Sequence, residues 1–253
     1  MKTKIFCDSA DLKVIKKLNN SSLVSGFTTN PSLMRKAGAK DYSKYSKEIL
    51  KITEVLFAPL GFSVDASKIR QCINLRAIVS NTTGVQHIDM EAAAKNDIAI
   101  CALHDDQTFL STITPTAEHT IGLMLAAWRQ IPAAHQAVLR GEWRRQDWGA
   151  PYMFSRMCLG LVGYGRLGKK VAAISKSMGM TVHYYDPHVD GGADHILDLA
   201  AMSNILSLHA VSTEETRGLV SKSVLSALPK HSIVINTARG ELLDTHALLD
   251  LME

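Results

Sequence analysis

The chain has 253 residues, of which 46% are hydrophobic and 21% are charged, and its formal net charge at pH 7 is +4. These proportions are ordinary for a globular protein, and the length is sufficient for a buried core in one large or two small domains. The modest charge is scattered along the chain and argues against a nucleic-acid partner. No apolar stretch approaches the ~20 residues of a membrane span.

The sequence carries no pattern that predicts export. The apolar run near the N-terminus, Ile5-Phe6-Cys7, is too short for a signal peptide. The four cysteines lie far apart and form no C-x-x-C pair, which predicts reduced thiols rather than a disulfide framework. We therefore expect a soluble, cytoplasmic protein.

Residues 1–53 predict two βα units. An apolar strand at Lys4–Asp8 is followed by an amphipathic helix, and a second short strand covers Leu23–Thr28. Pro31 then begins a second helix, at the position where proline is favoured.

Asp8 and Asn30 stand where these strands end, which is the edge at which barrel enzymes keep their chemistry. The motifs around them, Asp8-Ser9-Ala10 and Gly26-Phe27-Thr28-Thr29-Asn30-Pro31-Ser32-Leu33, resemble the transaldolase and fructose-6-phosphate aldolase family. That resemblance implies an eight-fold barrel with a Schiff-base lysine on its fourth strand, assisted by the aspartate and the asparagine. It stops near Thr53, before any strand that could carry the lysine, and two units cannot close a barrel. Sugar-phosphate aldolase chemistry is therefore an alternative function.

From Glu54 onward, strands and helices alternate as in an open parallel sheet. The expected strands are Glu54–Ala58, Leu75–Ser80 and Ile98–Cys101, and the expected helices are Asp65–Cys72 and Met90–Lys95. A long helix over Ala117–Ile131 follows, and its apolar positions cover most of its circumference. We expect this helix to be buried between two lobes.

A glycine-rich turn, Gly163-Tyr164-Gly165-Arg166-Leu167-Gly168, lies between an apolar strand and a helical pattern. This G-x-G-x-x-G spacing predicts dinucleotide binding. Gly163 permits the tight turn, Gly165 lets the backbone approach a pyrophosphate, and Gly168 lets the helix pack closely on the strand. The N-terminus of the helix then offers unpaired N–H groups to the phosphates.

The next expected strand, Thr181–Tyr185, ends at Asp186, close to the ~20-residue spacing of the acid that binds the adenosine ribose. A carboxylate at this place repels a 2′-phosphate, so NAD is favoured over NADP. Three nearby histidines, His183, His188 and His195, have no standard ligand spacing, and we expect no metal site.

Two further strands are expected, and chemically versatile side chains follow both. Asn204–Leu208 ends at His209, and Ser232–Asn236 is followed closely by Arg239. These side chains and the glycine turn would share the edge where open parallel sheets bind ligands. A guanidinium can hold a carboxylate through paired hydrogen bonds, which predicts that Arg239 fixes a 2-oxo or 2-hydroxy acid beside the nicotinamide ring.

Residues 54–253 resemble the NAD-dependent D-isomer-specific 2-hydroxyacid dehydrogenases. The motifs that carry this resemblance are TTGVQHID at Thr82–Asp89, TAEHT at Thr116–Thr120, the glycine turn with Asp186, His209-Ala210, and NTARG at Asn236–Gly240. The resemblance implies cofactor contacts at Thr83, Gly163, Gly165, Arg166, Leu167, Gly168, Asp186, His209, Ala210, Thr237, Ala238 and Arg239. It also implies that Arg239 holds the substrate carboxylate, that a small 2-hydroxy or 2-oxo acid reacts with NAD, and that the protein is a homodimer.

The expected fold is α/β, with a Rossmann-type doubly wound parallel sheet, a partial flavodoxin-like lobe and an N-terminal βα segment that resembles a TIM-barrel fragment. The expected domains are residues 1–53, a partial substrate lobe at 54–105 and an NAD-binding domain at 106–253. The family's acid/base histidine and its orienting glutamate follow the arginine by several tens of residues, whereas this chain ends at Glu253. Loss of such a proton acceptor costs on the order of 10² to 10⁴ in rate, so a non-catalytic NAD-binding module is a second alternative.

Overall fold

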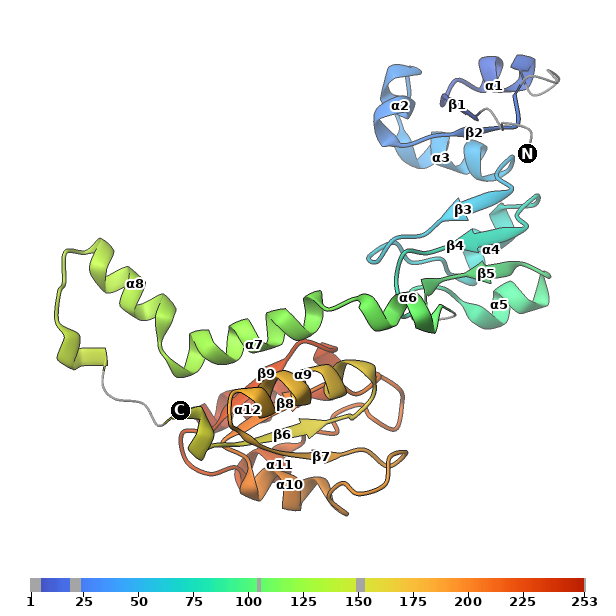
Figure 1. Ribbon diagram of the computed structural model, residues 1–253. Coiled ribbons are helices and arrows are strands. Elements are labelled where there is room, and N and C mark those ends of the chain that lie inside the picture. Colours follow the sequence, from blue (N-terminus) through green and yellow to red (C-terminus); the bar gives the residue numbers. More distant parts are fainter. Residues whose placement is uncertain (1–5, 19–23, 104–105, 149–152, 253) are drawn as a thin grey trace. The chain divides into compact units, whose positions relative to one another are not determined.

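A computed structural model describes residues 6–18, 24–103, 106–148 and 153–252 of the chain. The chain divides into two compact units, Met1–Leu110 and Ser111–Glu253 (Figure 1). Parts of the expected N-terminal strands, Lys4, Ile5 and Leu23, lie outside the described residues. No helix within the described ranges is long and apolar enough to cross a membrane.

The first unit contains two parallel sheets. β1 (Phe6–Asp8) pairs with β2 (Gly26–Thr28), and the second sheet has the order β3 (Val55–Phe57), β4 (Ala77–Val79), β5 (Ala99–Cys101). The helices of this part of the chain are α1 (Leu12–Leu18), α2 (Pro31–Lys36), α3 (Tyr42–Leu50), α4 (Ala66–Gln71), α5 (Met90–Lys95) and α6 (Gln107–Thr112), the last of which crosses the boundary between the units. β1 and β2 form an open pair, and the described strands close no barrel.

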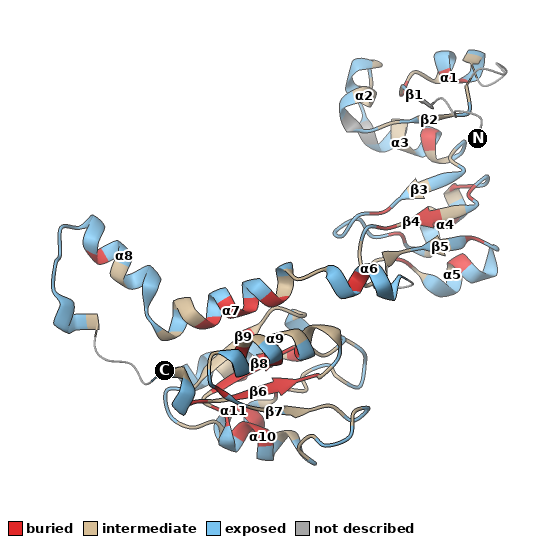
Figure 2. Cartoon of the chain, in the orientation of Figure 1, coloured by how far each residue is buried: buried red, intermediate tan, exposed pale blue. Residues whose placement is uncertain are grey.

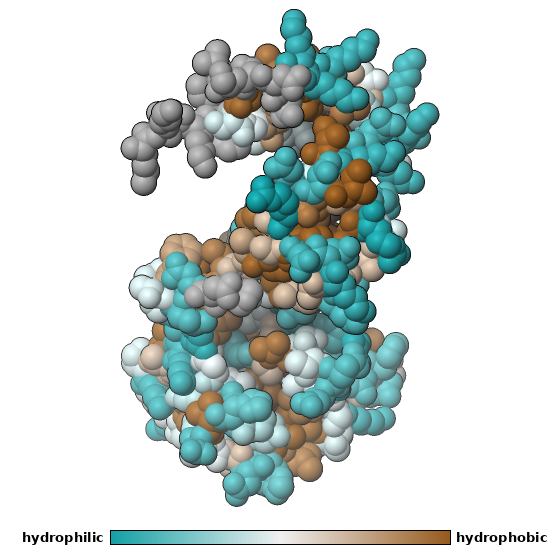
Figure 3. Space-filling view, turned by 90° about the vertical axis from the view of Figure 1, so that its right-hand side faces the viewer, coloured by the Kyte–Doolittle hydropathy of each residue, from teal (hydrophilic) through white to brown (hydrophobic). Residues whose placement is uncertain are grey.

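The core of the first unit lies around β4. Its buried residues are Ala58, Val64, Ile69, Cys72, Leu75, Ile78, Ile88, Ala93 and Ile98. Other apolar side chains of this unit reach the surface, among them Val55, Phe57 and Leu60. In the space-filling view, apolar patches interrupt a largely hydrophilic surface (Figure 3).

The second unit is built on one parallel sheet with the strand order β7-β6-β8-β9. The strands are β6 (Cys158–Val162), β7 (Thr181–Tyr185), β8 (Ile205–Leu208) and β9 (Ile233–Asn236). The helices are α7 (Pro115–Trp128), α8 (Ile131–Leu139), α9 (Arg166–Ser177), α10 (Ile196–Met202), α11 (Lys222–Ala227) and α12 (Thr245–Met252), with 3₁₀ turns η2 (Arg145–Trp148), η3 (Phe154–Arg156) and η4 (Gly240–Leu242).

Both faces of this sheet are covered by helices, and the central strands β6 and β8 are almost entirely buried (Figure 2). Successive side chains of a strand point to opposite faces. Accordingly, Leu159 and Leu161 join the core formed with α7 and α9, whereas Leu206 and Leu208 join the core formed with α10, α11 and α12. A strand buried on both sides reads as a continuous apolar run. The expected Rossmann-type α/β fold is therefore confirmed.

One helical prediction differs from the structure. The helix expected over Ala117–Ile131 ends at Trp128, and α8 begins at Ile131. The break lies at Gln130, whose φ of +52° is left-handed. Pro132 could not have continued α7, because it has no N–H group to donate to the carbonyl four residues earlier. The expectation that α7 is buried between two lobes concerns both units and stays a prediction. One face of α7 is buried (Figure 2). The buried residues are Ala117, Thr120, Ile121 and Met124, while Leu123 is 39% exposed.

Candidate functional site

The carboxyl ends of the four strands of the second unit form one edge, along which predicted cofactor residues lie. The parallel register aligns Tyr185, Val162, Leu208 and Asn236 across the sheet. The residues that follow them, in the same order, are Asp186, Gly163, His209 and Thr237. With about 4.8 Å between neighbouring strands, this row spans roughly 14 Å. Such a row suits a ligand that is stretched along the edge of the sheet.

The three glycines of the turn have different surroundings. Gly163 has a φ of +94°, and a Cβ atom there would come within 2.6 Å of the Ala210 nitrogen. A Cβ atom at Gly168 would lie 2.3 Å from the Gly163 carbonyl oxygen. At Gly165, no atom lies within 4 Å of the corresponding position. The packing of the protein itself thus requires Gly163 and Gly168, whereas Gly165 leaves open space for the approach of a ligand.

The N-terminus of α9 adjoins this open space. Its N-cap residue is Gly165, so no side chain caps the first N–H groups of the helix. Leu167 lies half-buried in the first turn, and Arg166 donates from Nη1 to the Ile113 carbonyl at 3.2 Å. An uncapped helix N-terminus binds anions. Together with the open position at Gly165, it fits the pyrophosphate of a dinucleotide.

Asp186 is held at one end of the row by backbone N–H groups. Its Oδ2 accepts a hydrogen bond from the Tyr164 N–H at 2.7 Å, and its Oδ1 accepts from the His188 N–H at 2.9 Å. The side chain is half-buried and lines an open pocket of about 250 Å³. The carboxylate is therefore oriented and remains accessible to a hydroxyl donor such as a ribose.

Tyr164 is a contributor that the sequence reasoning missed. Its ring stacks on Tyr184 of β7, with 3.8 Å between ring centroids and 6° between the ring planes. The Tyr184 hydroxyl donates to the Asp190 carbonyl at 2.5 Å, and a Cβ atom at Gly192 would meet the Tyr184 ring at 2.7 Å. The stack ties the glycine turn to the loop that follows Asp186. Two tyrosines at these positions were a signal, but sequence does not show that their rings meet.

His209 and Ala210 lie beneath the glycine turn. The His209 N–H donates to the Val162 carbonyl at 2.7 Å, and its Nε2 is 2.9 Å from the buried Ser207 hydroxyl. Burial lowers the pKa of His209 to about 4. The imidazole is therefore neutral at pH 7 and adds no charge beneath the turn.

The segment after β9 forms a turn that hydrogen bonds from its own side chains hold in place. Asn236 accepts a hydrogen bond from the Ala238 N–H at 3.0 Å and donates one to the Arg239 carbonyl at 2.8 Å. Arg239 is half-buried, and its Nη1 donates to the Ala238 carbonyl at 2.8 Å. Sequence reasoning also missed the role of Asn236, although asparagine at a strand end is a known signal for such a turn.

Other predicted residues lie in the first unit. Thr83 is exposed in the turn after β4. Asp8 accepts a hydrogen bond from the Thr28 hydroxyl, and the Asn30 Oδ1 caps α2 by accepting from the Leu33 N–H at 3.0 Å. The side chain of Asn30 thus has a structural partner at the start of its own helix.

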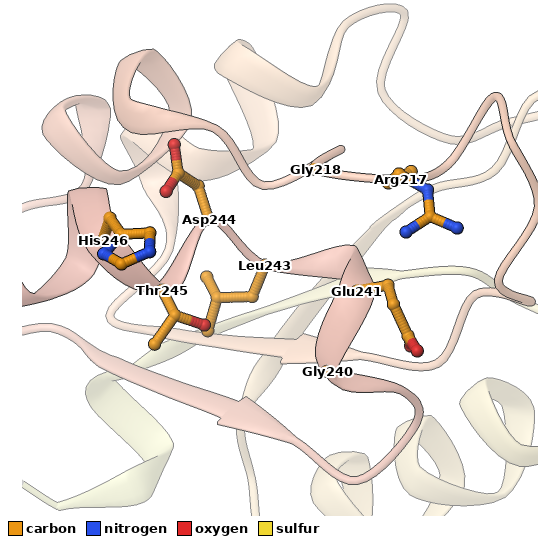
Figure 4. A pocket seen from close by; sticks show the side chains of 8 residues that line it. All are labelled: Arg217, Gly218, Gly240, Glu241, Leu243, Asp244, Thr245 and His246. Carbon is orange, nitrogen blue, oxygen red and sulfur yellow. The ribbon is translucent and has the colours of Figure 1, made fainter.

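A larger open pocket, of about 590 Å³, lies beside η4. Its lining residues are Arg217, Gly218, Gly240, Glu241, Leu243, Asp244, Thr245 and His246. Arg217 and Glu241 stand at one end, and Asp244, Thr245 and His246 stand at the other (Figure 4). None of the predicted cofactor residues lines this pocket, and the Asp244 carboxylate accepts from the Ala247 N–H at the start of α12. We therefore place the candidate cofactor site along the strand row.

Comparison with known families gives two matches along the chain. Residues 121–253 match the NAD-binding domain of the D-isomer-specific 2-hydroxyacid dehydrogenases. Residues 5–96 match the transaldolase and fructose-6-phosphate aldolase family. The second match extends past Thr53, where we expected that resemblance to stop.

Individual relatives are dehydrogenases and reductases. A D-3-phosphoglycerate dehydrogenase from Methanocaldococcus jannaschii is 29% identical over 96% of this chain, which covers 44% of that protein. A glyoxylate reductase from Aeropyrum pernix is 33% identical over 78% of this chain and 61% of its own length. The chain thus spans less than two thirds of either relative.

Solved structures show the same fold over nearly the whole chain. A D-lactate dehydrogenase from Aquifex aeolicus, solved with NAD and lactic acid, has a TM-score of 0.74 at 22% identity. The alignment covers 98% of this chain and 73% of that one. The family match covers more than half of the chain and concerns an NAD-binding domain, which confirms the prediction of NAD as the cofactor. The chain belongs to the D-isomer-specific 2-hydroxyacid dehydrogenase family.

Proposed function

We propose that the protein transfers hydride between NAD and a small 2-hydroxy or 2-oxo acid. The observation that carries this proposal is the row of Asp186, Gly163, His209 and Thr237 along one sheet edge, beside the open position at Gly165. The row places an oriented carboxylate at one end and the Thr237–Arg239 segment at the other. NAD would supply the hydride chemistry, and the residues of the chain would bind and orient both reactants.

Each end of the row has a separate task in this proposal. Asp186 accepts hydrogen bonds from the adenosine ribose, while the first N–H groups of α9 bind the pyrophosphate. At the opposite end, Arg239 binds the substrate carboxylate. A guanidinium has five N–H donors, and the bond from Nη1 to the Ala238 carbonyl holds it at the sheet edge.

The substrate class follows from the arginine and from the relatives. A guanidinium pairs with a planar carboxylate through two parallel hydrogen bonds, which orients an acid as well as attracting it. The named relatives act on phosphoglycerate and glyoxylate, and both are small acids with oxygen at the neighbouring carbon. We therefore propose a small 2-oxo or 2-hydroxy acid as the substrate.

The test begins with equilibrium titrations of the 253-residue chain with NADH and NADPH. Saturable binding that prefers NADH is the expected result, because the Asp186 carboxylate repels a 2′-phosphate. Binding of neither dinucleotide by a folded chain would overturn the proposal. Oxidation of NADH by a panel of 2-oxo acids above the uncatalysed rate would then exclude the non-catalytic alternative. Trapping of a lysine adduct by borohydride and a sugar phosphate would instead support the aldolase alternative.

We also propose that the protein is a homodimer, with α8 in the interface. Only Ala137 of this helix is buried, and Figure 1 shows α8 extending from α7 away from the sheet of its own unit. Ile131, Val138 and Leu139 are 52%, 49% and 67% exposed, and Trp143 just beyond the helix is 86% exposed. An exposed apolar surface of this kind typically marks a contact with another protein. Light scattering should give a dimer mass, and Leu139→Glu should shift it toward the monomer.

A further inference from the structure

A buried pair of threonines links α7 to the segment after β9. Thr120 is 0% exposed on the covered face of α7. Its Oγ1 lies 2.8 Å from the Thr116 carbonyl oxygen, one turn earlier in the same helix, and 2.8 Å from the Thr237 Oγ1. The two threonines thus form a polar contact within an otherwise apolar layer of helix on sheet.

The direction of these hydrogen bonds follows from counting protons. A hydroxyl group has one proton and two lone pairs, and a carbonyl oxygen can only accept. The Thr120 proton must therefore be donated to the Thr116 carbonyl. The contact between the two hydroxyls is then a bond in which Thr237 donates and Thr120 accepts. With its only proton used, the Thr237 hydroxyl can offer a ligand nothing but lone pairs.

Thr237 stands at the end of the row that is opposite to Asp186. It follows Asn236, which pairs with Leu208, and the Asn236 side chain closes the turn that contains it. Thr237 as a whole residue is half-buried, so the packing of α7 does not cover it completely. A dinucleotide with its adenosine ribose at Asp186 and its pyrophosphate at α9 would extend its nicotinamide half toward Thr237. The carboxamide of that half carries an NH₂ group, which is a hydrogen-bond donor.

We propose that Thr120 is a positioning residue, which fixes the Thr237 hydroxyl as a hydrogen-bond acceptor for the carboxamide NH₂ group of the nicotinamide. This inference rests on the proposed function, because it assumes that NAD lies along the strand row. Thr120 itself touches no ligand and acts through Thr237. An unfixed hydroxyl would present its proton to the NH₂ group in some of its rotamers and would lose the bond.

The test compares three ligands that differ at one end. NADH carries the carboxamide, the reduced 3-acetylpyridine analogue carries a methyl group in place of the NH₂ group, and ADP-ribose has no pyridine ring. Each is titrated against the native chain and against Thr120→Val, which removes the hydroxyl and keeps the side-chain shape. Thr120→Ser keeps the hydroxyl, and Thr116→Val is a matched control one turn away, since Thr116 contributes its carbonyl group.

Thr120→Val should weaken NADH binding roughly three- to tenfold, as expected for one lost hydrogen bond, and leave the other two ligands unchanged. Thr120→Ser and Thr116→Val should bind NADH within about twofold of the native chain, which is a smaller change than the loss of one hydrogen bond causes. Equal weakening of all three ligands, or no weakening of NADH, would overturn the role of Thr120. If Thr120→Val fails to fold, Thr237→Val provides the same comparison on the other partner. If the native chain binds neither NADH nor ADP-ribose, the proposed cofactor site itself is overturned. This outcome differs from the one that overturns only the role of Thr120.

Discussion

Gly165 and Gly168 lie three residues apart, yet alanine should affect different properties at the two positions: NADH binding at Gly165 and folding stability at Gly168. At Gly168 the added Cβ atom would lie 2.3 Å from the Gly163 carbonyl oxygen, which is backbone and cannot rotate away. Forcing an extra methyl group into packed structure costs about 1–3 kcal/mol of unfolding free energy. For a domain of this size, that is a loss of about 2–12 °C in melting temperature.

At Gly165 the same change meets no protein atom within 4 Å, and the backbone φ of −73° suits any residue. Replacing glycine in a compatible conformation stabilises by about 0.4–1 kcal/mol. Loss of a favoured N-cap residue costs about 0.5–1 kcal/mol. The two effects nearly cancel, so the melting temperature of Gly165→Ala should stay within about 3 °C of the native value. The methyl group would, however, occupy the space assigned to the pyrophosphate.

The assay pairs thermal unfolding, followed by circular dichroism, with NADH titration by calorimetry. Gly165→Ala should unfold like the native chain and bind NADH at least tenfold more weakly, which corresponds to about 1.4 kcal/mol. Gly168→Ala should melt earlier. Native NADH affinity in Gly165→Ala would refute the assignment of the open space to the cofactor. A melting temperature lowered as far as in Gly168→Ala would refute the packing argument.

Three further predictions concern the strand row. Asp186→Asn keeps an acceptor for the Tyr164 N–H group but removes the charge. The preference for NADH over NADPH should therefore fall about tenfold or more, in line with one charged hydrogen bond. An unchanged ratio of the NADH and NADPH affinities in paired titrations would contradict the ribose assignment. The folded-state pKa of His209, about 4, lies below the ordinary value of 6.5. Between these values the unfolded chain binds a proton that the folded chain does not. Stability should therefore fall as the pH is lowered from 6.5 to 4, by about 3 kcal/mol at most, and urea unfolding of His209→Gln should lack this slope. Asn236→Ala removes both hydrogen bonds that close the turn before Arg239, and should weaken NADH binding several-fold. Asn236→Asp retains the acceptor for the Ala238 N–H group and should weaken NADH binding less. Equal NADH affinities in the two variants would contradict a role of this turn in binding.

Much of the second unit follows from local sequence pattern. The apolar run of β6, the G-x-G-x-x-G turn and the acid after β7 predicted strand, turn, helix and cofactor class together, because each depends on residues close in sequence. Pro132 also carried a local signal, because it could not have continued the long apolar helix, which ends earlier than periodicity alone suggested. The stacking of Tyr164 on Tyr184 could not be predicted in the same way, since nothing in either neighbourhood specifies that the two rings meet.

The sequence by itself thus determined the α/β class, the glycine turn and the dinucleotide chemistry, because these depend on periodicity and on glycine sterics over short stretches. Only the tertiary structure decided which strand ends stand side by side, how the turn after Asn236 is closed, and that Gly165 faces open space. It also brought Thr120 against Thr237, 117 residues away. Such a contact depends on how α7 packs across β9, and packing is settled by the whole core rather than by the residues that meet.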